Sequence, residues 1–160
     1  MHKIVVFFTF LAVLLLLNFN IYQREIHLKE GVSIFLKLAP VDPRSLMQGD
    51  YMALHFEVSE SIPKNLTKDR GVYDGFILVD LDVNNVASFV SIYNNETLKE
   101  NQTLLQYRVR AGEVKFATNA FFFEEGSAKR YEKAKFGEFK VNDKHELLLI
   151  HLYDKDLTKI

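Results

Sequence analysis

Two carboxylates and an arginine stand close together in one proline-containing segment, and this combination could bind a cation or a polar ligand. They are Asp42, Arg44 and Asp50. Pro43 fixes its own φ angle and pushes Asp42 into an extended conformation, while Gly49 can adopt a positive φ just before the next strand. The same three charges could instead form an internal ion pair and a turn cap that hold the loop. Ordinary turn chemistry favours this structural role.

A second pair of acids follows a run of three phenylalanines. Glu124 and Glu125 come directly after residues 121–123 and before Gly126. Adjacent side chains on a strand point to opposite faces, so both carboxylates could serve one site only if the strand broke at Gly126. One of them could also lie at the N-terminus of a following helix, where the helix dipole favours an anion. For the phenylalanines we expect core and edge packing, with a partner-binding or lipid-facing surface as the alternative.

Several classes of chemistry lack support in the sequence. The chain has no cysteine and a formal net charge of -1, with basic residues that are not clustered, so we predict neither thiolate chemistry nor nucleic-acid binding. We also predict no cofactor. The histidines have no short-spaced partner on a helix, which argues against a metal site; they include His27, His55, His145 and His151.

The N-terminal segment is an apolar run. Residues 4–17 are apolar apart from Thr9, and the run continues to Tyr22. A membrane-spanning helix needs about 20 mostly apolar residues, and no small-x-small cleavage site follows the run. We therefore predict an uncleaved signal anchor over residues 1–23 that spans the bilayer with residues 4–22, with Tyr22 at the interface. Residues 24–160 then form an extracytoplasmic domain.

This second domain shows a mainly β pattern, typical of an antiparallel β-barrel or sandwich with one short helix. The helix is expected over residues 126–135, with Ser127 as its N-cap. Alternation predicts strands over residues 32–38, 51–58, 72–81, 86–93, 103–110, 114–118, 136–141 and 147–153. On the second of these strands, Met52, Leu54 and Phe56 should face the core, and Tyr51, Ala53 and His55 the opposite side.

Two blocks of residues resemble a known family. Gly49, Asp50, Tyr51 and Leu54 match the pattern Gly-Asp-Tyr-x-x-Leu-x-Tyr, with Phe56 in place of the final tyrosine. This segment resembles the GDYXXLXY family of bacterial membrane-anchored proteins, as does a second block that begins at Asn119-Ala120-Phe121 and continues through Phe136-Gly137-Glu138. The resemblance extends over nearly the whole chain. It implies a location in the bacterial inner membrane but no established activity.

An anchor followed by Gly49-Asp50 and an alternating strand also looks like the start of the type I signal peptidase barrel. In that family a catalytic serine precedes the Gly-Asp pair and a lysine lies on a later strand. Here Val41 stands near the serine position, and Gln106-Tyr107-Arg108 offers no lysine. Without the Ser–Lys dyad we expect no peptidase activity and no enzyme.

We therefore expect a non-catalytic accessory or interaction domain that partners another membrane protein. Family members often occur near multi-spanning membrane proteins, which suggests that kind of partner. The alternative is a small-ligand or cation-binding domain that uses Asp42, Arg44, Asp50 and Glu124. In either case the two blocks should meet in one core, with Glu124 or Glu125 reaching Arg44.

Overall fold

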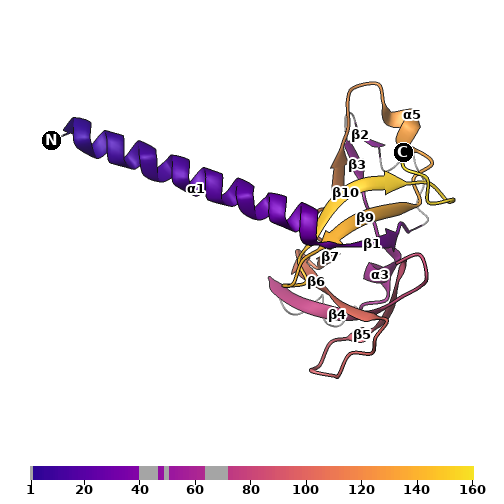
Figure 1. Ribbon diagram of the computed structural model, residues 1–160. Helices are drawn as coiled ribbons and strands as arrows, with labels where there is room; N and C mark the ends of the chain where they lie inside the picture. Colours follow the sequence, from indigo (N-terminus) through magenta and orange to yellow (C-terminus); the bar gives the residue numbers. More distant parts are fainter. Residues whose placement is uncertain (1, 40–46, 49–50, 64–71) are drawn as a thin grey trace.

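The computed structural model describes residues 2–39, 47–48, 51–63 and 72–160, and it consists of one long helix attached to a small β domain (Figure 1). Helix α1 runs from His2 to Glu30. It is long and apolar enough to cross a membrane, and its most apolar part is not buried against the domain. The predicted span over residues 4–22 lies inside α1. The helix continues beyond residue 23 because its last turns are polar but still helix-forming, with an i,i+4 pair between Lys29 and Glu25 at 3.4 Å.

The β domain contains three antiparallel sheets within the described residues. The first has the order β1 (Val32–Lys37), β9 (Phe136–Val141), β10 (Leu147–Tyr153). The second has the order β2 (Met47–Gln48), β3 (Tyr51–Ala53), β8 (Ala120–Phe122). The third has the order β5 (Ala87–Ile92), β4 (Tyr73–Leu81), β6 (Gln102–Arg110), β7 (Glu113–Lys115). The predicted mainly β, antiparallel class is confirmed.

Short bridges join these sheets into a curled half-barrel (Figure 1). Phe35 on β1 forms a parallel bridge with Val86, and its N–H donates to the carbonyl of Asn85 at 2.9 Å. An antiparallel bridge between Leu38 and Phe56 connects the first sheet to the chain that follows β3. The inward faces of all three sheets therefore enclose one core.

Phe56 lies in the middle of this core. Its ring is 1% exposed and makes edge contacts with Phe139 at 5.3 Å and with Phe116 at 6.4 Å between ring centroids. Tyr107 is also fully buried, and its hydroxyl pairs with that of Tyr73 at 2.6 Å. Phenylalanine at position 56 suits an environment of apolar rings, where a tyrosine hydroxyl would need its own hydrogen-bond partner.

The predicted strand over residues 51–58 is too long. β3 ends at Ala53, and a single helical turn, α3, follows at Glu57–Glu60. Ser59 stabilises the turn, because its N–H and its hydroxyl both donate to the carbonyl of Phe56, at 2.9 and 2.5 Å. The turn buries Val58, which is 4% exposed and belongs to the core.

The predicted helix over residues 126–135 is also too long. Helix α5 covers only Ala128–Tyr131, and Ser127 makes no side-chain capping bond. The chain leaves the helix because the N–H of Lys135 donates to the carbonyl of Tyr153 on β10, at 2.7 Å. Pairing with the sheet therefore replaces further helical turns.

A buried histidine attaches α1 to the first sheet. His27 is 5% exposed, and its Nε2 lies 2.9 Å from the carbonyl oxygen of Lys140 on β9. The N–H of Gly31 donates to the carbonyl of His27 at 3.1 Å, directly before β1 begins. These contacts hold the end of α1 against the edge of the domain.

Candidate functional site

The two family-like blocks meet as neighbouring strands, as the sequence predicts. Tyr51 lies opposite Phe122, Met52 opposite Phe121, and Ala53 opposite Ala120 in the β3–β8 pair. Beyond this pair the N–H of Leu54 donates to the carbonyl of Asn119 at 2.7 Å. Segments about 70 residues apart in the chain thus form one local unit.

The predicted core-facing side of the first block is confirmed, whereas Ala53, predicted on the opposite side, is half-buried and packs against the core. Met52, Leu54 and Phe56 are 3%, 0% and 1% exposed, so all three belong to the core. Tyr51 is half-buried and His55 is exposed on the opposite side. Leu54, a motif residue, therefore has a packing role, while Tyr51 and His55 remain accessible.

Aromatic side chains gather where β8 leaves the sheet; we call Tyr51, Phe121, Phe122, Phe123 and Tyr131 the edge aromatic cluster. The rings of Tyr51 and Phe122 are 5.7 Å apart, and Phe123 stacks on Tyr131 at 5.1 Å. Phe121 also contacts Tyr131 at 5.1 Å and packs against the core. Phe122 differs from the other phenylalanines of this run because it is 75% exposed. Two of the three phenylalanines therefore pack inward, and one presents an apolar ring to the surroundings.

Glu124, Glu125 and Gly126 form the turn between β8 and α5. Both carboxylates are exposed, and neither forms an ion pair within the residues that the structure describes. Gly126 has a φ of 81°, and the N–H of Ser127 donates to the carbonyl of Glu124 at 3.0 Å. This is the position at which a type II turn requires positive φ, so the glycine is explained by the turn.

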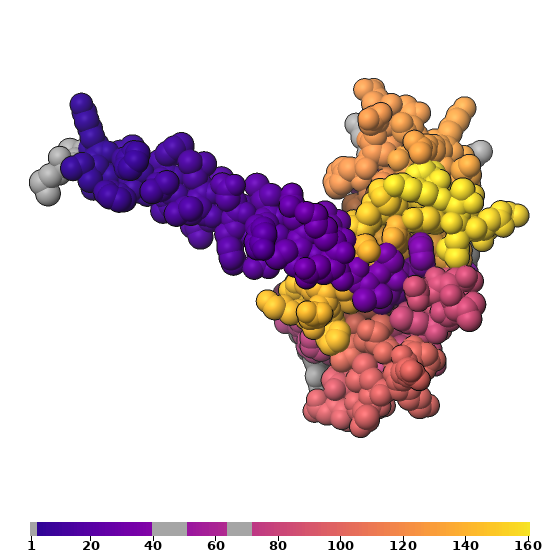
Figure 2. Space-filling model, in the orientation of Figure 1, coloured from indigo at the N-terminus to yellow at the C-terminus, as the bar shows by residue number. Residues whose placement is uncertain are grey.

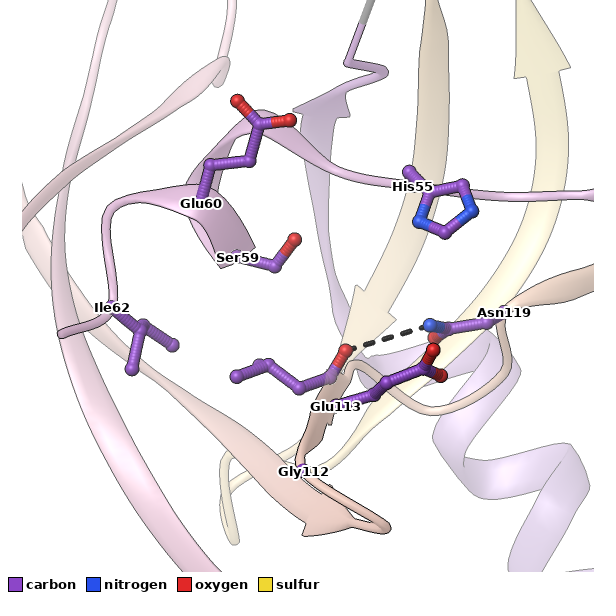
Figure 3. A pocket seen from close by; sticks show the side chains of 8 residues that line it. His55, Ser59, Glu60, Ile62, Gly112, Glu113 and Asn119 are labelled. Atoms are coloured by element: carbon purple, nitrogen blue, oxygen red, sulfur yellow. Dashed lines mark hydrogen bonds between the residues drawn. The ribbon is translucent and has the colours of Figure 1, made fainter. Parts of the chain in front are cut away.

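A cleft of about 320 Å³ opens beside the first block, between α3 and the β6–β7 hairpin (Figure 3). His55 and Asn119 face each other at one end, and Ser59 and Glu60 lie toward the other (Figure 3). The amide nitrogen of Asn119 donates to the carbonyl of Val114 at 3.5 Å. Its Oδ1 is buried and has no hydrogen-bond partner among the described residues. The cleft thus combines an unsatisfied acceptor with an accessible imidazole.

A polar network lies on the outer face of the first sheet. Glu138 accepts hydrogen bonds from the hydroxyls of Ser33 at 3.0 Å and Tyr153 at 2.8 Å. Burial and the hydrogen bond to Glu138 raise the pKa of Tyr153 to about 12. His151 lies beside Glu138 in the register and has its Nε2 2.7 Å from the Nζ of Lys159. Burial and the neighbouring lysine charge lower the pKa of His151.

Four of the predicted site residues lie outside the described residues: Asp42, Arg44, Gly49 and Asp50. Their predicted contact with Glu124 or Glu125 stays a prediction. Among the residues that are described, no group of three His, Asp or Glu side chains is placed to hold a metal ion.

The cleft and the Glu138 network were not predicted, although parts of their signal are present in the sequence. Alternation placed His55 on the face opposite the core, and Asn119 and Glu138 both stand in the second family-like block. Ser59, Glu113, Tyr153 and the other contributors come from distant segments and have no local pattern that joins them.

Comparison with known proteins gives a family and no closer relative. No curated protein and no solved structure matches the chain. The family model described as GDYXXLXY protein matches residues 13–152, which include the end of α1 and nearly all of the β domain. The two blocks that pair as β3 and β8 therefore lie within a match over most of the chain, and the chain belongs to the GDYXXLXY family.

Proposed function

We propose that this protein is a single-pass protein of the bacterial cytoplasmic membrane whose extracytoplasmic domain is a non-catalytic interaction subunit for a multi-spanning membrane protein. The observation that carries this proposal is the edge aromatic cluster, with Phe122 75% exposed on β8, within the range that matches the family model. Large exposed aromatic side chains are enriched in the centres of protein interfaces.

The anchor supports a partner within the same membrane. α1 has 29 residues, and at about 1.5 Å per residue it is about 43 Å long, which exceeds the roughly 30 Å of a hydrocarbon core. Its apolar side chains are exposed along the helix. Insertion into a bilayer would remove this apolar surface from water.

The position of the edge aromatic cluster suits lateral docking. β3 and α5 lie to one side of the axis of α1, away from the point where the helix joins the domain (Figure 1). A domain held by α1 would therefore present the cluster along the membrane surface. A neighbouring membrane protein could cover it without displacing the anchor.

The free energy gained by burying the Phe122 ring is large enough for a binding hot spot. Burying an exposed phenylalanine ring stabilises a complex by about 2 kcal/mol, which is about thirtyfold in affinity. Phe122 loses little conformational entropy on binding, because its backbone is already fixed by pairing with Tyr51.

Site-specific photocrosslinking in membranes tests this proposal. The full-length protein carries a benzophenone amino acid at position 122 or, as a matched control, at position 83. Val83 is 100% exposed and lies on the β4–β5 turn, far from the cluster in sequence. We expect a discrete crosslink from position 122 to one multi-spanning protein, and none from position 83.

A variant without the ring shows whether the Phe122 side chain itself binds the partner. Phe122→Ser should weaken recovery of that partner about tenfold or more after detergent extraction. It should leave the unfolding temperature nearly unchanged, since the ring is mostly exposed. Equal crosslinking from both positions, or undiminished recovery of the partner with Phe122→Ser, contradicts the proposal.

The cleft favours small-ligand binding as a second candidate function. The unpaired Oδ1 of Asn119 needs a donor, and Glu60 adds a carboxylate with no ion pair among the described residues. Glu113 adds a second carboxylate, which Lys115 approaches only to 3.9 Å, so an organic cation fits the cleft best. Putrescine is a suitable probe: it should raise the unfolding temperature of the wild-type protein and not of Glu113→Gln. Identical curves with and without putrescine reject this candidate.

A further inference from the structure

A groove of about 520 Å³ separates the last turns of α1 from the turn between β9 and β10; we call it the juxtamembrane groove. Figure 2 shows the end of α1 running against the domain beside this hairpin. The helix contributes Gln23 and Arg24 to the groove, and the turn contributes Asp143, Lys144 and Glu146.

The groove extends across the point at which the apolar part of α1 ends. Its lining starts at Phe19 and Asn20 and reaches His27, which is one face of the helix over two turns. Residues 19–27 extend along the axis for about 12 Å, and residues 23–27 reach about 7 Å beyond residue 22. The headgroup layer on one side of a bilayer is roughly 5–8 Å thick beyond the hydrocarbon core. With residues 4–22 in the hydrocarbon core, the part of the groove at residues 23–27 therefore lies at the depth of the lipid headgroups.

Both walls of the groove are held in place by hydrogen bonds. On the helix side, His27 is attached to the carbonyl of Lys140 at 2.9 Å. On the turn side, Oδ1 of Asn142 accepts from the N–H groups of Lys144 and Glu146, both at 3.0 Å, and its amide donates to Glu146 at 2.9 Å. The groove is therefore formed before any ligand enters, which reduces the entropy cost of binding.

Charges of both signs line the groove, and none of them is in an ion pair. Within the described part of the chain, the groove residues Arg24, Asp143, Lys144 and Glu146 have no ion-pair partner within 4.0 Å. The Glu146 carboxylate accepts a hydrogen bond from the amide of Asn142, which leaves Asp143 as the carboxylate without a hydrogen bond to that side chain. A guanidinium and an ammonium suit a phosphate. A carboxylate beside them suits a second, cationic group on the same ligand. A lipid headgroup that carries both charges matches this arrangement.

We propose that the juxtamembrane groove binds the headgroup of a phospholipid that carries a phosphate and a primary ammonium, the ethanolamine class. Arg24 and Lys144 bind the phosphate, and Asp143 accepts hydrogen bonds from the ammonium. This inference rests on the membrane anchor in the proposed function. Its consequence is orientation: a lipid held between α1 and the β9–β10 turn fixes the rotation of the domain above the membrane, and with it the direction in which the edge aromatic cluster faces.

Lipid retention by the full-length protein tests this binding. The protein is reconstituted into bilayers that contain equal amounts of phosphatidylethanolamine, phosphatidylcholine and phosphatidylglycerol, all with the same acyl chains. It is then extracted in mild detergent, and native mass spectrometry counts the lipids that remain bound. The wild type should retain the ethanolamine lipid in excess of both others, because choline cannot donate hydrogen bonds and glycerol carries no positive charge.

Three variants separate the two halves of the site. Arg24→Gln and Lys144→Gln should each lower retention about fivefold. Asp143→Asn should keep phosphate binding but equalise the ethanolamine and choline lipids. Lys29→Gln is the matched control and should behave as the wild type, since Lys29 is on the same helix but is paired with Glu25 and lies outside the groove.

The outcomes distinguish this inference from the anchor on which it rests. Protein that leaves the bilayers in an alkaline wash overturns the anchor and the lipid site together. Protein that remains in the bilayers but retains the three lipids equally overturns only the lipid site. So does a loss of retention with Lys29→Gln as large as that with Arg24→Gln.

Discussion

Replacement of the motif leucine, Leu54→Ala, should destabilise the β domain strongly. The side chain is 0% exposed and belongs to the core between the β3–β8 pair and the first sheet. The change removes three carbon atoms, which costs about 2.4 kcal/mol in transfer free energy at about 0.8 kcal/mol for each. The cavity left behind adds to this value, so we expect a total loss of about 3–4 kcal/mol.

Circular dichroism of the full-length protein in mild detergent measures this loss during thermal unfolding. For a domain of this size, about 3 kcal/mol corresponds to a decrease in unfolding temperature of roughly 10 °C. The signal to follow is the β component, because α1 should stay helical in the micelle. His55→Ala is the matched control on the next residue, where the exposed side chain should change stability by less than about 0.5 kcal/mol.

A loss below about 1 kcal/mol for Leu54→Ala would contradict the reasoning. It would mean that the core collapses around the site, or that the leucine is not enclosed by the β3–β8 pair. An equal loss for His55→Ala would show that the two faces of this segment are not distinct. Either result would show that Leu54 of the family motif does not have the packing role assigned to it.

Three further predictions concern other parts of the domain. The folded state raises the pKa of Tyr153 to about 12. The stability that its protonated hydroxyl supplies is therefore fully present below about pH 10 and should be lost as the pH approaches 12. Tyr153→Phe should remove this alkaline dependence of the unfolding free energy, measured by urea unfolding at a series of pH values. Gly31→Ala should lower the unfolding temperature, since a Cβ at Gly31 would lie 2.6 Å from the carbonyl oxygen of His27 and force the junction of α1 and β1 to shift, at a cost of about 1–3 kcal/mol. Arg44→Ala and Glu124→Ala should show a coupling free energy on the order of 1 kcal/mol in a double-mutant cycle, and strict additivity would remove the predicted ion pair.

Local pattern was enough to predict much of the fold. The strands of the final hairpin, Phe136–Val141 and Leu147–Tyr153, have the predicted bounds, because alternation and the Asn142 turn both lie within a few residues. The core-facing side of the first block was predicted for the same reason. The errors at residues 51–58 and 126–135 come from contacts that are distant or specific: burial of Val58 in the core, and pairing of Lys135 with Tyr153.

The candidate site was predictable only in part. The sequence determined that the two blocks carry the accessible and the buried aromatic residues, because composition and period-two alternation are properties of short segments. It also determined an apolar helix long enough to act as an anchor. Alternation puts Phe122 on the face opposite Phe121 and Phe123, but it did not decide which face is exposed, because both faces carry the same side chain.

Contacts between distant residues depend on the packing of the whole domain. The β3–β8 register, the cleft between α3 and the β6–β7 hairpin, and the groove between α1 and the β9–β10 turn each join segments separated by many residues. Such contacts depend on how the whole chain closes around one core, since each long loop must be closed before its contacts can stabilise the fold. No single segment encodes that closure, and the sequence therefore specifies the surfaces of each strand and helix while their joint packing creates the sites.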